Sequence, residues 1–248
     1  MRFDGKIVVV TGGASGIGLA TCQQFAKAGA QVVLTDIDAK KAAVKAEEIT
    51  VAGGKAVFLE LDITNPASVE AAAERVRSDY GRLDVLVNAA GWDIIEPFMQ
   101  NTREYWSRIV ALNFMGPVEV TRAMLPLMFE SGGGSVVNVS SDAGRVGSFG
   151  ETVYAGAKGG IIAFTKSLAR EVVRKDVRVN CVCPGPTDTP LFATQSPKMQ
   201  EALTNAIPMK RLGKPSEVAD VILFFGSDRS SFVTGQVLSV SGGLTMAG

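Results

Sequence analysis

Tyr154 and Lys158 stand four residues apart within Thr152–Arg170, a stretch whose apolar spacing predicts one amphipathic helix. A spacing of four places both side chains on one helical face, one turn apart. Such a pair suits proton transfer at an alcohol or ketone oxygen, because a fixed ammonium stabilises a phenolate and lowers the phenol pKa from its usual value near ~10. The alternative is a half-buried Tyr beside a surface Lys with no catalytic role. Other parts of the sequence are needed to distinguish these two interpretations.

The composition excludes several other kinds of chemistry. The 248 residues include no histidine, which excludes Ser-His-Asp hydrolysis, Cys-His chemistry and His-ligated zinc. The base must therefore be Tyr, Lys, Cys or a carboxylate, and we expect no metal. Lys+Arg and Asp+Glu number 25 each, and this zero net charge argues against binding to nucleic acid or to a membrane surface.

Hydropathy and cysteine content are typical of a globular cytoplasmic protein. Hydrophobic residues make up 46% of the chain, enough for a sizeable core, and no apolar run approaches the ~18 residues of a membrane span. No signal-peptide pattern precedes the first strand. Cys22, Cys181 and Cys183 form an odd number without a CxxC motif, so we expect reduced thiols in a cytoplasm.

A strand, a glycine-rich turn and a helix open the chain. The apolar run Lys6–Thr11 leads into Gly12-Gly-Ala-Ser-Gly16-Ile-Gly18, and a helical pattern then continues to Gly29. In this arrangement the glycines let the backbone approach a pyrophosphate, and the helix N-terminus faces its negative charge. The spacing is GxxxGxG rather than GxGxxG, but it lies in the required strand–turn–helix context.

Asp36 ends the second strand, Gln31–Asp36, about 20 residues beyond the glycine turn, where a ribose-binding carboxylate belongs. The alternative is an ordinary polar residue at a strand end. Ala14, Ser15 and Ile37 include no cation that could hold a 2′-phosphate. The sequence therefore favours NAD over NADP as cofactor.

Strands alternate with helices along the whole chain, which predicts an α/β fold: one Rossmann-type, doubly wound parallel sheet of about seven strands with helices on both faces. No linker divides the chain, so we expect a single domain over residues 1–248. The stretch 187–209 contains three prolines and little periodicity, and it is interpreted as a mobile substrate lid. The expected strands are Lys6–Thr11, Gln31–Asp36, Lys55–Leu61, Asp84–Asn88, Gly134–Ser141, Val177–Cys183 and Gln236–Val240.

The segments that end these strands are similar to the motifs of the short-chain dehydrogenase/reductase family, over essentially the whole chain. Thr11–Gly18 resembles the cofactor turn TGxxxGxG, and Asn88-Ala-Ala-Gly91 resembles the NNAG element, with Ala89 in place of the second Asn. Pro184-Gly185 and Thr189 resemble the segment that meets the nicotinamide amide. The family's four catalytic residues correspond to Asn113, Ser141, Tyr154 and Lys158.

This resemblance implies a role for each residue. Tyr154 exchanges the proton of the alcohol, Ser141 orients the substrate oxygen, and Asn113 holds a water that links Lys158 to solvent. Lys158 holds the nicotinamide ribose and lowers the pKa of Tyr154, while Asp36 accepts hydrogen bonds from the adenosine ribose. The implied cofactor contacts are Gly12, Ser15, Gly16, Ile17, Gly18, Asp36, Asp62, Ile63, Asn88, Ala89, Gly91, Tyr154, Lys158, Pro184, Gly185, Thr187 and Thr189.

Four segments along the expected cleft are similar to family members that oxidise a ring secondary alcohol of a CoA thioester with NAD, in the degradation of aromatic and alicyclic acids. The resemblance therefore implies a secondary alcohol or ketone as substrate, and possibly a CoA thioester. The segments are Gly91–Ile94, Ser141–Gly147, Cys183–Asp188 and Gly235–Met246. The residues expected to touch substrate are Trp92, Arg145, Phe149, Phe192 and Met199.

Four alternatives stay open at this point, three of them substrate classes. Family members that act on aryl-ethanols, hydroxysteroids or 3-oxoacyl thioesters share the same framework, and fold does not settle function within it. A catalytically idle dinucleotide-binding sensor or scaffold is a more remote alternative. The resemblance also implies a homotetramer built partly on the helices that carry Asn113 and Tyr154.

Overall fold

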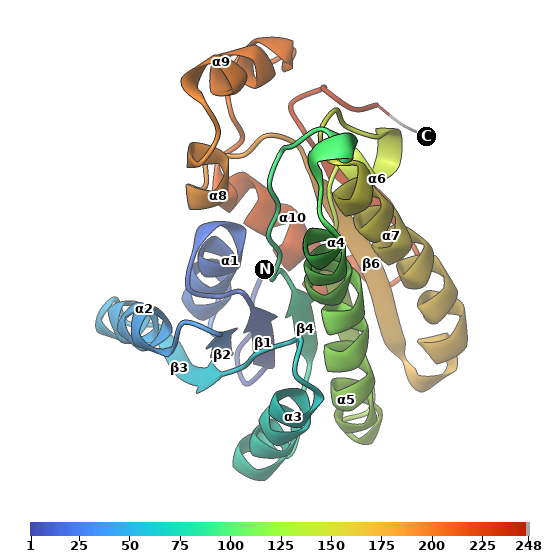
Figure 1. Ribbon diagram of the computed structural model, residues 1–248. Coiled ribbons are helices and arrows are strands. Elements are labelled where there is room, and N and C mark those ends of the chain that lie inside the picture. The colour runs from blue at the N-terminus through green and yellow to red at the C-terminus, as the bar shows by residue number, and fades with distance from the viewer. Residues whose placement is uncertain (247–248) are drawn as a thin grey trace.

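The computed structural model describes residues 1–246, and its described residues form one sheet of seven parallel strands in the order β3-β2-β1-β4-β5-β6-β7 (Figure 1). The order reverses between β1 and β4, as in a doubly wound fold, so the predicted fold class is confirmed. Ala247 and Gly248, the last residues of the predicted domain, lie outside the described residues. The strands are β1 (Ile7–Thr11), β2 (Gln31–Asp36), β3 (Lys55–Glu60), β4 (Val85–Asn88), β5 (Gly134–Val139), β6 (Val177–Pro184) and β7 (Val237–Val240).

Helices cover both faces of the sheet, α1, α2 and α10 on one face and α3, α5 and α7 on the other (Figure 1). In the part of the chain that the structure describes, no helix combines the length and the apolar character needed to cross a membrane. The helices are α1 (Gly16–Lys27), α2 (Ala39–Val51), α3 (Pro66–Tyr80), α4 (Arg103–Val110), α5 (Gly116–Glu130), α6 (Ala143–Val146), α7 (Thr152–Val172), α8 (Pro190–Ala193), α9 (Pro197–Ala206) and α10 (Pro215–Gly226).

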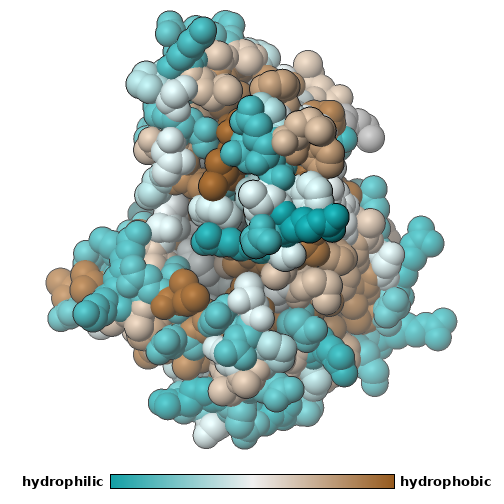
Figure 2. All heavy atoms as spheres, in the orientation of Figure 1, coloured by the Kyte–Doolittle hydropathy of each residue, from teal (hydrophilic) through white to brown (hydrophobic). Residues whose placement is uncertain are grey.

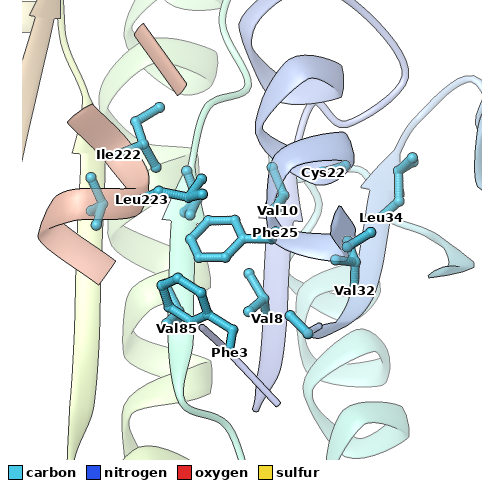
Figure 3. Close-up of a cluster of buried hydrophobic side chains, with 14 of the residues drawn as sticks. Phe3, Val8, Val10, Cys22, Phe25, Val32, Leu34, Val85, Ile222 and Leu223 are labelled. Atoms are coloured by element: carbon cyan, nitrogen blue, oxygen red, sulfur yellow. The ribbon is translucent and has the colours of Figure 1, made fainter. Parts of the chain in front are cut away.

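The strands are continuously apolar because both faces of the sheet are buried. Val8 and Val10 of β1 pack toward α1 and α10, whereas Val9 packs toward the helices of the opposite face. Figure 3 shows the first of these cores, in which the fully buried ring of Phe25 meets Phe3 edge-on at 4.8 Å between centroids. The alternation of side chains along each strand thus divides one apolar run between two cores.

The stretch between α4 and α5 contains a π-helix, Ala111–Met115, that the sequence did not predict. There the backbone N–H of Gly116 donates to the carbonyl of Ala111, five residues back instead of four. The wider turn is a single insertion in an otherwise continuous helix, and such insertions are frequent at functional sites. Asn113 lies in the middle of it.

The stretch 187–209 holds two short helices, α8 and α9, where the sequence indicated only weak periodicity. Each begins at a proline, and the residue before it caps the helix: Thr189 Oγ1 accepts from the Phe192 N–H, and Ser196 Oγ accepts from the Met199 N–H. Together these helices form the upper part of the molecule in Figure 1, and brown apolar atoms gather there beside teal ones in Figure 2. In the sequence, each of these helix starts is marked by a capping Thr or Ser directly before a proline, a pattern typical of a helix N-terminus.

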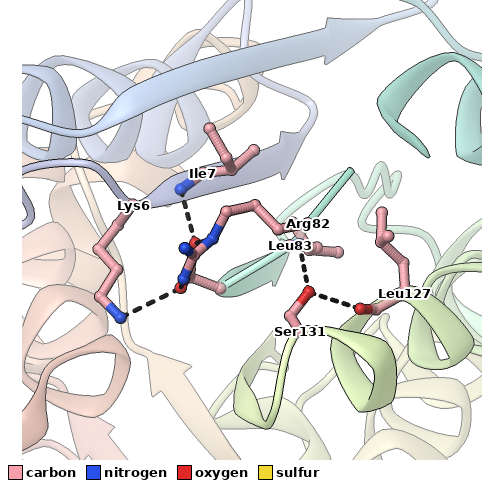
Figure 4. Close-up of polar contacts among 7 residues, drawn as sticks. Lys6, Ile7, Arg82, Leu83, Leu127 and Ser131 are labelled. Atoms are coloured by element: carbon pink, nitrogen blue, oxygen red, sulfur yellow. Dashed lines mark hydrogen bonds and ion pairs between the residues drawn. The ribbon is translucent and has the colours of Figure 1, made fainter. Parts of the chain in front are cut away.

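Asp84 ties the start of β1 to the start of β4 on the edge of the sheet opposite the ligand-binding turns (Figure 4). Its buried carboxylate accepts hydrogen bonds from the Ile7 N–H at 2.9 Å, from Lys6 Nζ at 3.1 Å and from Arg82 Nη2 at 2.6 Å. Burial alone would raise the pKa of Asp84, but these three donors outweigh it and the pKa is lowered. The carboxylate therefore stabilises the folded state in its charged form.

We expect Asp84→Asn to lower the free energy of unfolding at pH 7 by about 1–3 kcal/mol, because several donors lose a charged acceptor. Because the pKa of Asp84 is lower in the folded state, its charge stabilises the protein at every pH above the ordinary aspartate pKa of about 4. That contribution is lost as the pH falls through the folded-state pKa. Urea unfolding of both proteins at pH 7 and pH 3 should therefore show a smaller difference at pH 3. Glu47→Gln, on the exposed face of α2, is the matched control, and a pH-independent difference would contradict this account.

Candidate active site

Two adjoining cavities lie along the carboxyl ends of the strands, where an α/β sheet binds ligands. The first, of about 370 Å³, borders the glycine turn, Asp36 and Asp62, and the second, of about 430 Å³, borders Ser141, Tyr154 and Lys158. Every residue expected to contact the cofactor lines one cavity or the other, except Asn88. The residues shared by the two linings are Ile17, Ala89, Gly91, Thr189 and Leu191.

The glycine turn has the geometry of a phosphate cradle. Gly12 has φ +67°, and a Cβ there would lie 2.8 Å from the Ala90 Cα. A Cβ on Gly18 would lie 2.1 Å from the Gly12 carbonyl oxygen. The side chain of Ser15 makes no capping hydrogen bond to α1, so the first N–H groups of this helix are available to an anion. This part of the first cavity fits the pyrophosphate of a dinucleotide.

Asp36 joins the end of β2 to the glycine turn. Its Oδ2 accepts from the Ala14 N–H and its Oδ1 from the Asp38 N–H, both at 3.0 Å. The carboxylate also lines the first cavity, beside the exposed side chain of Ile37. Among the described residues of this lining, Arg108 is the one cation, and its guanidinium stacks 3.9 Å from the centroid of the Trp92 ring.

Asn88 is the exception among the expected cofactor residues. Its side chain is buried below the cavities and donates from Nδ2 to Thr121 Oγ1 at 2.9 Å and to Asn138 Oδ1 at 2.8 Å. The loop that follows β4 is held instead by Thr11, whose Oγ1 accepts from the N–H groups of Ala89 and Ala90. Asn88 thus links β4 to α5 and to β5. Its side chain lines neither cavity and is not placed to contact a cofactor.

Asn113 and Lys158 both lie beside Gly91, which lines both cavities, whereas Asn113 itself lines neither. Asn113 is fully buried; its Nδ2 donates to the Trp92 carbonyl at 2.8 Å and its Oδ1 accepts from the Trp92 N–H at 3.3 Å. Lys158, 3% exposed, donates from Nζ to the Val139 carbonyl at 3.0 Å. A Cβ on Gly91 would lie 2.9 Å from Asn113 Oδ1 and 3.3 Å from Lys158 Nζ, so a side chain at this position would crowd both groups.

Tyr154 lies on the same face of α7 as Lys158, whose Nζ is 5.6 Å from the centroid of the phenol ring. The pKa of Tyr154 is raised. Burial is the largest cause, Glu151 and Asp93 add to it, and the hydrogen bond with Ser141 acts in the opposite direction. The lowering by Lys158 that the family resemblance implies stays a prediction. Burial also lowers the pKa of Lys158 to about 8.

Asp93 and Glu151 line the second cavity beside Tyr154, and the sequence did not single out either of them. Asp93 is 6% exposed, and its Oδ1 accepts from Tyr105 Oη at 2.7 Å. Burial raises the pKa of Asp93 to about 7; the bond from Tyr105 opposes this shift, and the neighbouring Glu151 carboxyl adds to it. The part of the cavity beside Tyr154 therefore contains two neighbouring carboxyl groups.

The expected substrate residues are scattered. Phe192 lines the second cavity and Trp92 the first, whereas Arg145, Phe149 and Met199 line neither. Arg145 Nη1 donates to Ser239 Oγ at 2.9 Å, and Phe149 is 80% exposed. The lining residues that the sequence did not indicate include apolar ones, Ile95, Val146, Leu191, Leu203 and Leu244, and polar ones, Asp93, Ser148, Glu151, Gln195 and Thr245.

Comparisons with known proteins find similar sequences over nearly the whole chain. The family described as "Enoyl-(Acyl carrier protein) reductase" matches residues 12–245. A 3-oxoacyl-[acyl-carrier-protein] reductase of Thermotoga maritima is 41% identical over 246 residues, covering 99% of this chain and 100% of the relative. The (2S)-[(R)-hydroxy(phenyl)methyl]succinyl-CoA dehydrogenase subunit BbsD of Thauera aromatica is 36% identical over 246 residues, 99% of each chain.

Further relatives and solved structures extend the likeness. The 2,5-dichloro-2,5-cyclohexadiene-1,4-diol dehydrogenase LinX of Sphingobium indicum is 37% identical over 98% of this chain and 97% of its own. The crystal structure of gox2181 superposes with a TM-score of 0.94 at 32% identity, over 98% of this chain and 96% of that one. A Mycobacterium ulcerans structure titled as a short-chain type dehydrogenase/reductase gives 0.93 at 33% identity, over 98% and 91%. These names include reductases and dehydrogenases of several substrate classes.

Proposed function

This chain belongs to the short-chain dehydrogenase/reductase family of oxidoreductases, and we propose that it interconverts a secondary alcohol and a ketone with NAD. The observation that carries the proposal is the meeting of Ser141, Tyr154 and Lys158 in one cavity that adjoins the cavity of the glycine turn and Asp36. A non-catalytic NAD-binding sensor or scaffold would have no use for a phenol base beside a lysine. Loss of turnover on a broad alcohol panel, with NADH still bound, would favour that remote alternative.

The chain's own residues handle the proton and the orientation of the substrate. Ser141 donates a hydrogen bond to the substrate oxygen, and Tyr154 Oη takes the alcohol proton in oxidation and returns it in reduction. Lys158 Nζ stabilises the phenolate and binds the ribose next to the nicotinamide, and buried Asn113 fixes the loop at Trp92. When it is bound, the nicotinamide accepts or supplies the hydride at the carbinol carbon.

As the best substrate we propose 2-hydroxycyclohexanecarboxyl-CoA, oxidised to 2-oxocyclohexanecarboxyl-CoA in aromatic or alicyclic acid degradation. The apolar lining of the second cavity suits a ring, and the four cleft segments resemble enzymes of this class. The names of BbsD and LinX describe one dehydrogenase of a CoA thioester and one of a cyclic diol. The Thermotoga reductase favours 3-oxoacyl-thioester reduction as the second candidate, and aryl-ethanol oxidation is the third.

The test is a substrate panel measured by NAD reduction and, in reverse, by NADH oxidation. It should contain the cyclic hydroxyacyl-CoA, a straight-chain 3-hydroxyacyl-CoA, a 3-oxoacyl-[acyl-carrier-protein] and 1-phenylethanol. The highest kcat/KM on the cyclic thioester supports the proposal, whereas a higher value on either straight-chain thioester supports the second candidate. No turnover with any of them refutes both.

Cofactor choice is expected to depend on Asp36. A carboxylate that lines the adenosine end of the groove repels a 2′-phosphate and loses solvation beside it. We expect kcat/KM to be much higher with NAD than with NADP, and the double variant Asp36→Ala/Ile37→Arg to narrow or reverse that preference. Ile37→Arg alone, which keeps the carboxylate, is the matched control. Equal kcat/KM for both cofactors in the unmodified protein would refute this assignment.

Three further features remain part of the proposal. The stretch 187–209 supplies Leu191, Phe192 and Leu203 to the cavity lining, which supports a lid that closes over bound ligands. The family resemblance supports a homotetramer, testable by light scattering of the eluted protein. Three free, buried cysteines support a reducing, cytoplasmic location.

A further inference from the structure

We propose that Asp93 and Glu151 share one proton and that this carboxyl pair donates it to a second, carbonyl oxygen of the substrate. The pair would select alcohols that carry a carbonyl close to the carbinol carbon, such as a 3-hydroxy thioester. This inference rests on the proposed function, because it names what the same cavity recognises beyond the reacting oxygen.

The Asp93 carboxyl is fixed but incompletely satisfied. Tyr105 Oη donates to Oδ1 at 2.7 Å, while Oδ2 is buried and receives no hydrogen bond from a donor group among residues 1–246. The Glu151 carboxyl is the neighbour placed to hydrogen-bond with Asp93. Two carboxyl groups can share a hydrogen bond only if one of them keeps its proton, so this contact requires an acid and its conjugate base.

The groups around the pair favour keeping that proton near neutral pH. Glu151 faces Asp93 from the turn before α7, Tyr105 faces it from α4, and Tyr154 and Lys158 approach from α7. Of these, only Lys158 is a cation, and its Nζ donates to the Val139 carbonyl rather than to either carboxyl. A second ionisation would therefore place two charges together in a largely apolar cavity.

Proton transfer at Tyr154 does not explain why the pair is there. Glu151 and Asp93 both raise the pKa of Tyr154, which opposes alcohol oxidation. Glu151 stands three residues before Tyr154, about one turn along the same side of the helix. A substrate whose carbinol oxygen is held by Tyr154 and Ser141 would present a neighbouring carbonyl to the pair. Recognition of that oxygen offsets the unfavourable effect on the phenol.

The experiment compares two substrates that share a ring: the N-acetylcysteamine thioester of 2-hydroxycyclohexanecarboxylic acid, and cyclohexanol. The readout is the ratio of the kcat/KM for the thioester to the kcat/KM for cyclohexanol. A change that affects only Tyr154 alters both values by the same factor and leaves the ratio unchanged. We expect Glu151→Leu to lower the ratio by about tenfold or more, as for loss of a buried hydrogen bond. Glu151→Gln keeps an N–H donor and should hold the ratio within about threefold. Glu171→Leu, at the far end of α7, is the control.

The pH dependence gives a second, independent readout. In the unmodified protein the ratio should fall as the pH rises through about 7, because the shared proton leaves. In Asp93→Asn it should stay flat, because the carboxyl that titrates is replaced by an amide, which keeps an N–H donor. An unchanged ratio in Glu151→Leu, or a flat ratio in the unmodified protein, overturns the inference while leaving the proposed function intact. Absence of turnover on both substrates, with NAD still bound, overturns the proposed function itself.

Discussion

Tyr154→Phe is expected to lower kcat for alcohol oxidation by about 10²–10⁴-fold while the Kd for NADH stays nearly unchanged. The variant lacks the phenol oxygen that we propose as proton acceptor, and the remaining ring still fills its place beside Lys158, whose Nζ lies 5.6 Å from the ring centroid. Steady-state kinetics in both directions measure the first quantity, and a fluorescence titration with NADH measures the second.

The matched control makes the same chemical change at another tyrosine. Tyr80→Phe removes a phenol oxygen at the end of α3, near Arg75 and Asp79 and away from the two active-site cavities. We expect this variant to retain the activity of the unmodified protein. A Tyr154→Phe protein that kept more than a tenth of the original rate would overturn the assignment of the base.

Lys158→Ala is expected to lose activity by two routes, a misplaced nicotinamide ribose and a phenol that stays protonated. Removing a cation near a phenol that is already buried beside Glu151 and Asp93 lets the Tyr154 pKa rise further. The midpoint of kcat/KM against pH for alcohol oxidation should therefore move to higher pH, and raising the pH should rescue the variant in part. Only the second defect responds to pH.

Lys158→Arg separates charge from geometry. The arginine keeps a cation at this position. However, Lys158 is 3% exposed and its Nζ lies close to Gly91, so the larger guanidinium cannot take the same position. We expect its activity to be low but above that of Lys158→Ala. If the Lys158→Ala profile runs parallel to that of the unmodified protein, with no shift of midpoint, Lys158 serves only to bind the ribose.

The fold could be predicted because its signals are local. Val8, Val9 and Val10 form an uninterrupted apolar run, which is typical of a parallel strand buried on both faces. Asn65 before Pro66, and Gly81 with φ +64°, mark the ends of α3. The handedness of the crossovers follows from a general rule for parallel strands. The strand order comes from the structure itself.

The site could be predicted only where a residue type carries the chemistry itself. Tyr154 and Lys158 share a helix, so their spacing revealed them. The approach of Asp93 to Glu151 depends on the path of the loop after β4, and no local pattern indicates it. Arg145 was expected at the substrate because it is a cation near Ser141, but its guanidinium reaches Ser239 at the start of a hydrogen-bonded chain to Asp142.

The π-helix at Ala111–Met115 limits how this chain can change in length. An α-helix advances about 3.6 residues per turn, so a residue lost within α5 would rotate every later side chain by more than a quarter turn and pull Met124 out of the core. A residue lost within the π-helix would instead restore a regular helix on both sides and leave that core intact. The hydrogen bonds between the Asn113 side chain and the Trp92 backbone would be lost. The number of residues between α4 and α5 is therefore fixed by the placement of Asn113, and a shorter version of this segment could survive as a folded protein with Asn113 out of place.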